Sequence, residues 1–173
     1  MKKLLCLCLM TVFLVGCSKQ EAFETVSDEY VHPAEVEMQQ TAIQIPEGAV
    51  VTAMQNDMVG SLYFCDDYTM TLHTMQSGDL NQTIREVTGF EKDQLHMMET
   101  AADNARRYDF VWVSAGEGEE QVGRAAILDD GAYHYVLTCM TDASNARALQ
   151  ESWQTLFESF ILVAPGEDPY TGS

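Results

Sequence analysis

Residues 107–140 read RYDFVWVSAGEGEEQVGRAAILDDGAYHYVLTCM, and this stretch decides the fold. It contains three runs rich in β-branched and aromatic residues, at 107–115, 121–129 and 132–140. Short acidic or glycine-containing segments separate the runs, which is typical of antiparallel strands joined by hairpins. Asp130-Gly131 is the clearest turn, because glycine tolerates the positive φ that a tight hairpin requires.

The three runs are apolar on both of their alternating faces. Tyr108 and Phe110 share one face of the first run, and Val111 and Val113 share the other. The two later runs repeat this pattern, whereas a sheet with one wet face alternates more cleanly between apolar and polar residues. We therefore expect an α+β fold, with a central antiparallel sheet of about six strands and helices on both faces.

Further strands are expected before this stretch. Residues 59–65 and 68–74 are β-rich runs separated by Asp66-Asp67, which predicts a hairpin. Residues 94–100 form another run, directly before the first strand of the stretch quoted above. These three runs bring the expected number of strands to six.

Two helices are also expected. The shorter covers residues 79–87, where Asp79 can cap the start, Gln82 can complete a capping box and Gly89 suits the exit. The longer covers residues 142–160, because its apolar residues recur at spacings of three and four. That apolar face consists of Ala146, Leu149, Trp153, Leu156, Phe157 and Phe160.

Residues 99–162 resemble the second half of a PsbP-like domain. The resemblance lies in the late hairpin, the aromatic strand Tyr133-His134-Tyr135, the long helix and the ending Ser159-Phe160. In that family an antiparallel sheet lies between helices, so the resemblance implies an α/β/α sandwich over roughly residues 48–163. The family includes accessory subunits of photosystem oxygen evolution and other interaction proteins. It therefore implies a binding role, with no particular functional residue.

The first residues, MKKLLCLCLMTVFLVGCSKQ, have the form of a secretion signal. The apolar run at 4–15 rises about 18 Å as a helix, well short of the roughly 30 Å hydrocarbon core of a bilayer. Its ending, Leu14-Val15-Gly16-Cys17, resembles the lipobox of bacterial lipoproteins, whose cysteine receives a diacylglycerol and becomes the first mature residue. The resemblance implies lipid attachment at Cys17, with acyl chains such as palmitate, at the cell membrane and facing outside the cytoplasm.

The charge of the chain limits its partners. Without residues 1–16 the chain has seven basic and 27 acidic residues, a side-chain net charge of −20. Such a surface repels nucleic acid and anionic lipid headgroups. Attachment to the membrane must then come from the acyl chains.

Composition divides the chain into four expected segments: a signal peptide at 1–16, an acidic flexible tether at 17–45, one globular domain at 46–163 and a disordered tail at 164–173. The tether is acidic and lacks sustained apolar periodicity. Pro46-Glu47-Gly48 is turn chemistry and marks the entrance of the domain. The tail contains two prolines and two glycines.

Cys65 and Cys139 are the two thiols that lie beyond Cys17. Outside the cytoplasm they can form a disulfide, which requires their Cα atoms to lie within about 7 Å of each other. The alternative is that both are buried, inert thiols. No Cys-x-x-Cys motif supports a redox site or a zinc–thiolate site.

Metal binding has two possible sources in the sequence. His32, His73, His96 and His134 could converge on a metal ion, three of them from predicted strands, but HExxH is absent. The acidic pairs Asp66-Asp67, Glu119-Glu120 and Asp129-Asp130 could hold calcium, but the EF-hand pattern is absent. Turns favour Asp for its local backbone hydrogen bonds, so the default interpretation is that these are turn residues. No metal ion or cofactor is therefore assigned.

Signatures of nucleophilic catalysis are absent too. The chain contains neither G-x-S-x-G nor S-x-x-K. His134 and Cys139 are five apart in one predicted strand, which places them on opposite faces and prevents a dyad. We therefore expect a protein that is not an enzyme.

The leading hypothesis is a lipid-anchored extracytoplasmic binding module at the cell envelope, with an unidentified envelope protein as partner. The first alternative is a lipoprotein that binds calcium, zinc or a small solute. The second is a hydrolase whose site is assembled from residues distant in sequence, as sites often are.

Overall fold

The computed structural model describes residues 37–53, 59–102, 105–115 and 119–164. In chain order the elements are β1 (Gln40–Ala42), β2 (Val50–Ala53), β3 (Val59–Phe64), β4 (Thr69–Gln76), α1 (Leu80–Thr88), a 3₁₀ turn (Lys92–Gln94), β5 (Met97–Ala102), β6 (Ala105–Ala115), β7 (Glu120–Asp129), β8 (Tyr133–Asp142), α2 (Gln150–Glu158) and β9 (Ile161–Val163). No helix in these ranges is long and apolar enough to cross a bilayer.

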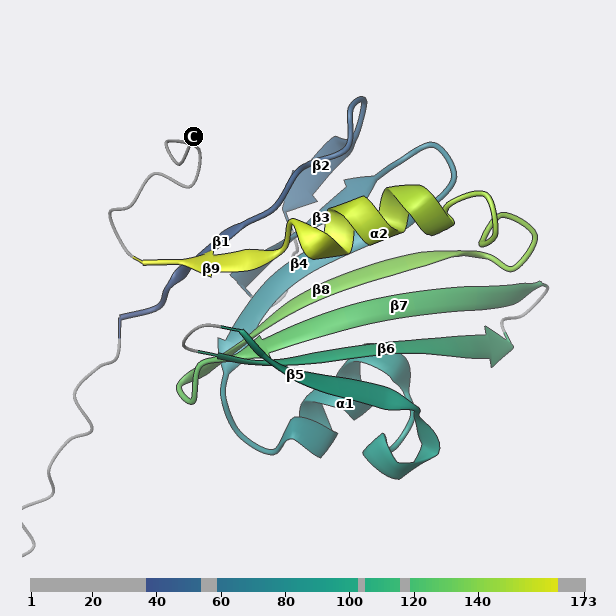
Figure 1. Cartoon of the computed structure of the whole chain (residues 1–173). Helices are drawn as coiled ribbons and strands as arrows, with labels where there is room; N and C mark the ends of the chain where they lie inside the picture. Colours follow the sequence, from purple (N-terminus) through teal and green to yellow (C-terminus); the bar gives the residue numbers. More distant parts are fainter. Residues whose placement is uncertain (1–36, 54–58, 103–104, 116–118, 165–173) are drawn as a thin grey trace, which may run out of the picture. The chain divides into compact units, whose positions relative to one another are not determined.

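A seven-stranded antiparallel sheet is the centre of the fold (Figure 1). Its strand order is β2-β3-β4-β8-β7-β6-β5. Strand β8 therefore lies between two groups of strands, β2–β4 on one side and β5–β7 on the other. The expected α+β class and central antiparallel sheet are confirmed. The sheet has seven strands instead of about six, because Val50–Ala53 pairs with β3 as an additional edge strand.

A second, two-stranded sheet joins the two ends of the described chain. Strand β1 pairs antiparallel with β9, with Gln40 opposite Val163, and Ile43 is buried directly after β1. The predicted tether at 17–45 therefore overlaps the domain, and the entrance expected at residue 46 is placed too late. A strand of three residues whose partner lies some 120 residues away leaves no local periodicity to detect.

The β7–β8 hairpin forms as expected from its turn residues. Gly131 has φ of 90°, the left-handed conformation that glycine adopts without strain. The Asp130 carboxylate accepts hydrogen bonds from the backbone N–H of Ala132 and of Tyr133, at 2.9 and 2.7 Å. The other oxygen of Asp130 accepts the Tyr135 hydroxyl at 2.9 Å.

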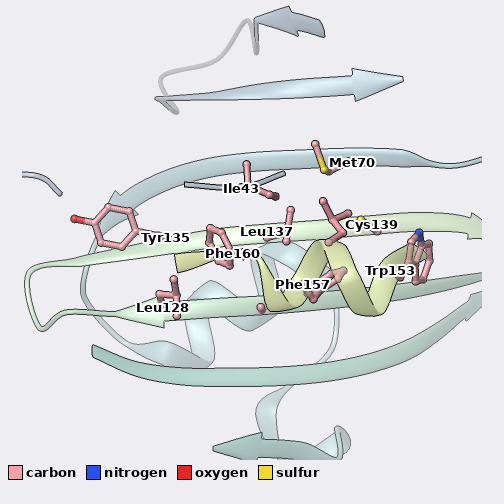
Figure 2. Packing of buried hydrophobic residues seen from close by; sticks show 11 residues of the cluster. Ile43, Met70, Leu128, Tyr135, Leu137, Cys139, Trp153, Phe157 and Phe160 are labelled. Atoms are coloured by element: carbon pink, nitrogen blue, oxygen red, sulfur yellow. The ribbon is translucent and has the colours of Figure 1, made fainter. Parts of the chain in front are cut away.

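Alternate residues of β7 and β8 enter two separate hydrophobic clusters, because successive strand side chains point to opposite faces. One cluster contains Leu128 and Leu137 together with Phe157 of α2 (Figure 2). The other contains Ile127 and Ile84, which belongs to α1. The two-sided apolar pattern in the sequence thus corresponds to burial on both faces of the central strands.

Close packing in the second cluster requires a glycine. Trp112 of β6 lies opposite Gly123 of β7 in the sheet. A Cβ atom on Gly123 would come within 2.3 Å of the Trp112 ring, a distance that real contacts do not reach.

Helix α1 has the expected boundaries but not the expected capping box. The Asp79 side chain accepts the N–H of Asn81 at 3.0 Å, and Gly89 ends the helix in the left-handed conformation. Gln82 donates to Glu86 one turn later, at 2.9 Å, and so does not complete a capping box.

Helix α2 is shorter than the predicted helix at 142–160. Strand β8 continues as far as Asp142, which pairs with Gln121 of β7 and so cannot begin a helix. The N–H of Ala143 then donates to the carbonyl of Glu120 at 2.8 Å, and residues 143–149 form turns. Only Gln150–Glu158 remains helical.

Arg107 of β6 connects the sheet to the end of α2. Its guanidinium donates twice to the Asp109 carboxylate, from Nε at 2.7 Å and from Nη2 at 2.9 Å. It also donates to the carbonyl oxygens of Phe157 at 2.8 Å and Phe160 at 3.0 Å. Carbonyl groups at a helix C-terminus lack donors within the helix, and Arg107 provides donors for them.

His134 of β8 connects the sheet to α1. Its side chain is 1% exposed, and its Nδ1 atom lies 2.8 Å from the Thr83 hydroxyl of α1. Its Nε2 atom lies 3.3 Å from the Ser77 hydroxyl, which in turn donates to Asp129. Burial lowers the pKa of His134, although the charges of Asp129 and Asp130 oppose this shift. The imidazole is therefore neutral in the folded protein at neutral pH.

Replacing Arg107 tests its role as a connector. In Arg107→Gln the Asp109 carboxylate and two carbonyl groups lose a charged donor in a mostly buried place, so we expect the free energy of unfolding to fall by about 2–4 kcal/mol. Urea denaturation measures this loss. The matched control is Arg106→Gln, because Arg106 is the exposed neighbour. Equal stability of the two variants would contradict the role.

The buried histidine predicts a dependence of stability on pH. The pKa of His134 is lower in the folded protein than the value of about 6.5 in an unfolded chain, so the unfolded chain binds more protons below that pH. Stability should be constant above about pH 6.5 and fall below it, by at most about 1.4 kcal/mol per pH unit for one site.

Urea denaturation at pH 7.5 and 5.5 measures this effect, and His134→Gln should lose less stability between the two values than the wild type. Burial also lowers the pKa of His73, so a smaller slope persists in the variant. An identical slope in wild type and variant would show that His134 does not carry the effect.

Candidate functional site

A groove of about 640 Å³ lies between the start of α2 and strands β5–β7. Its floor is formed by side chains on one face of the sheet: Met98 of β5, Val111 of β6, and Val122 and Arg124 of β7. The strand register explains this grouping, because Val111 and Arg124 are directly opposite each other. The volume lies within the range of about 300–1,000 Å³ that is usual for small-molecule sites.

The wall of the groove comes from α2 and from the turns that precede it. Trp153 and Gln150 belong to α2, and Arg147 belongs to the turn segment at 143–149. His96, directly before β5, also lines the groove. The turn segment that follows the end of β8 at Asp142, together with the late start of α2 at Gln150, therefore creates this wall.

The floor of the groove is unusually apolar for a surface. Met98 is 60% exposed and Val111 is 54% exposed. Val113, two residues further along β6 on the same face, is 51% exposed and extends the apolar surface. Neighbouring exposed apolar side chains mark surfaces that bind a partner or a ligand.

Arg124 is a cation with no hydrogen-bond or ion-pair partner in the part of the chain that the structure describes. Its guanidinium stacks on the Phe157 ring, 4.3 Å from the centroid. Within the described ranges it makes no hydrogen bond and no ion pair shorter than 4 Å. Burial lowers the pKa of Arg124 and the charge of Asp109 opposes this shift, but an arginine keeps its proton in proteins.

The carboxylate nearest to the floor is already paired. Asp109 lines the groove, yet both of its oxygens accept hydrogen bonds from Arg107. The negative charge of Asp109 is therefore compensated by Arg107, whereas the positive charge of Arg124 has no ion-pair partner within the described residues. With Arg147, these arginines are three of the seven basic residues from Cys17 onward, gathered in a chain whose net charge is −18.

The groove is suited to holding an anionic group beside an apolar body. Its lining, among the residues that the structure describes, contains no serine, threonine or cysteine that could act as a nucleophile. Guanidinium groups bind carboxylate and phosphate oxygens well, and the surrounding apolar side chains lower the competition from water.

A second polar cluster has the residue types of a hydrolase triad but the wrong hydrogen bonds. Ser77, His134 and Asp129 lie together, yet the Ser77 hydroxyl donates its proton to Asp129. Ser77 can then only accept the proton of His134 Nε2, and the other ring nitrogen, Nδ1, lies 2.8 Å from the Thr83 hydroxyl. His134 therefore offers no free nitrogen to deprotonate Ser77, as a triad requires.

The histidines do not meet at a metal site. His73 and His134 lie on the face of the sheet that contacts α1, whereas His96 lines the groove next to α2. His32 lies outside the described residues. No group of three His, Cys, Asp or Glu side chains is placed to hold a metal ion in the described ranges.

The acidic pairs lie at turns, as the default interpretation expected. The Asp129 carboxylate accepts the N–H of Gly131 at 2.9 Å, and Asp130 accepts two backbone donors of the same turn. Asp66 and Asp67 occupy the bend between β3 and β4. Glu120 begins β7 directly after Glu119.

Both remaining cysteines are free thiols in the structure, so their disulfide stays a prediction. Cys139 is buried in the cluster that contains Phe157, and Cys65 is half-buried. Burial raises the pKa of both thiols, which reduces their reactivity. Cys139 and His134 lie on opposite faces of β8, as predicted. Cys17 lies outside the described residues.

Sequence reasoning did not find the groove, although one signal was present. Arg124 is a charged residue between Gly123 and Ala125, in a run at 122–128 that is otherwise free of polar side chains. A charge at such a position needs either a partner or a ligand. That signal gives no information on Arg147 or Trp153, which reach the groove only through the tertiary fold.

No family model matches the chain, and no curated protein sequence matches it. Solved structures with a similar fold exist. The solution structure of cyanobacterial PsbP (CyanoP) from Synechocystis sp. PCC 6803 has a TM-score of 0.54 and 10% identity, over 76% of this chain and 96% of that chain. The crystal structure of LpqN, involved in cell envelope biogenesis of Mycobacterium tuberculosis, has a TM-score of 0.51 and 11% identity, over 74% and 85%. The expected PsbP-like fold is confirmed, and at these identities the likeness concerns the fold alone.

Proposed function

We propose that this protein is a lipid-anchored binding module at the extracytoplasmic side of the cell membrane, and that the groove beside α2 is its binding site. The observation that carries the binding role is Arg124, a half-buried cation that lies on an exposed apolar floor and has no hydrogen-bond or ion-pair partner among the described residues. A half-buried guanidinium whose N–H groups make no hydrogen bond within the described ranges can donate them to an anionic ligand.

The sandwich expected from the PsbP-like resemblance provides a rigid frame for such a site. We infer that α1 and α2 cover opposite faces of the sheet, since Ile84 and Phe157 enter separate clusters with alternate residues of β7. Side chains on central strands are held by packing on both sides. The position of Arg124 in β7 is therefore well defined.

The proposed location rests on the lipobox-like ending at Cys17. Diacylglycerol would supply two acyl chains, and two chains hold a protein stably where one does so only marginally. LpqN, whose fold is similar, is involved in cell envelope biogenesis, and this supports the proposal of an envelope location for the present chain. An envelope protein as partner stays a prediction.

The anchor is tested by replacing its cysteine. In Cys17→Ser no thiol is present to receive diacylglycerol. We therefore expect the variant to be absent from the membrane fraction, in which the lipidated wild type is found. Mass spectrometry of the purified protein measures the acyl mass on residue 17, and Cys65→Ser is the control. Unmodified Cys17 in the wild-type protein would refute the anchor.

The groove is tested by filling it. Val111→Trp places a large ring on the exposed floor and should reduce the binding of the neutral apolar fluorophore N-phenyl-1-naphthylamine several-fold. The matched control is Val50→Trp, because Val50 is equally apolar, is 63% exposed and lies on the far edge strand β2. Wild-type affinity in Val111→Trp would show that the groove does not bind the probe.

A further inference from the structure

We infer that the groove binds a single-chain amphiphile, with an anionic head group at Arg124 and an apolar chain along β6. This inference rests on the proposed function and adds the chemical class of the ligand. Among the described residues, the groove combines an uncompensated cation with an extended apolar surface, which are the two features that such a ligand requires.

The head group is assigned by charge. None of the five N–H donors of Arg124 makes a hydrogen bond within the described ranges, and both oxygens of the nearby Asp109 already accept hydrogen bonds from Arg107. Arg147 adds a second cation at the wall of the groove. A carboxylate or phosphate group between these side chains would form charge-assisted hydrogen bonds, which are stronger than neutral ones.

The apolar part is assigned by the floor. Val111 lies directly opposite Arg124, and Val113 follows on the same face of β6. Met98 borders them from β5, and its flexible thioether side chain adapts to different chain shapes. An acyl chain that begins at Arg124 would therefore cover side chains that are more than half exposed in the free protein.

A single ligand fits better than an anionic bilayer surface. The chain has a net charge of −18, so an anionic membrane surface would repel most of the domain. The cations are confined to a concave site of about 640 Å³, a volume suited to one small molecule. The inference therefore commits to a free amphiphile as occupant.

The test uses the mature chain, residues 17–173, carrying Cys17→Ser so that it is unacylated. Dodecanoate and dodecyltrimethylammonium have alkyl chains of nearly the same length and opposite charge, and each is used below its micelle concentration to displace N-phenyl-1-naphthylamine. We expect dodecanoate to displace the probe at a concentration at least tenfold lower than dodecyltrimethylammonium does. Arg124→Gln should weaken the binding of dodecanoate about tenfold and leave the binding of the neutral probe unchanged.

Two further variants control for charge and folding. Arg85→Gln removes the same charge from α1, where Arg85 pairs with Glu91, and should leave dodecanoate binding unchanged. Val111→Asp places a carboxylate opposite Arg124 at an exposed position, so it should weaken the binding of dodecanoate. This variant provides the test if Arg124→Gln fails to fold. Circular dichroism melting curves show which variants are folded.

The outcomes separate the two proposals. Binding of the neutral probe with equal displacement by both surfactants would overturn the ligand class and leave the groove as a binding site. Absence of probe binding to the wild type would overturn the binding site itself. Arg124-dependent binding to phosphatidylglycerol vesicles, without competition by dodecanoate, would overturn the inference in favour of a membrane surface.

Discussion

Burial of β8 on both faces is the constraint on which the remaining structure depends. Residues 134–139 are six consecutive buried positions, so neither face of this strand can be left to water. Its neighbours β4 and β7 satisfy its backbone groups, and two separate hydrophobic clusters enclose its side chains. Residues of α2 and Ile43, which directly follows β1, enter one cluster, and Ile84 of α1 enters the other.

The groove follows from incomplete coverage of the same sheet. Helix α2 has only nine residues, and Arg107 of β6 donates hydrogen bonds to the carbonyl groups of Phe157, in its last turn, and Phe160, directly beyond it. Its aromatic side chains pack on β7 and β8, while Met98 and Val111 beyond them stay exposed. The turn segment that replaces the first two turns of the predicted helix forms the outer wall. The feature that the sequence pattern misjudged is therefore the one that shapes the site.

Local patterns predicted the elements whose stability is local. The β7–β8 hairpin depends on Asp130-Gly131, and α1 depends on Asp79 and Gly89, all of which are recognisable from neighbouring residues. Strands β1 and β9 depend on each other across the whole domain, and the true start of α2 depends on pairing of Asp142 with β7. Such long-range pairing overrides local helix propensity and leaves no periodic signal. The site was missed for the same reason, because its lining comes from four separate elements.

The favourable contact that Arg124 makes does not by itself account for its place in the sheet. A cation stacked on an aromatic ring gains about 0.5–2 kcal/mol, and Phe157 provides this gain. Partial burial also takes part of its hydration from the guanidinium, which lowers the pKa of Arg124. An apolar residue at position 124 would pack on Phe157 without this cost. The arrangement becomes favourable when an anion occupies the groove, because charge-assisted bonds then replace the lost hydration of the guanidinium while the apolar floor loses its contact with water.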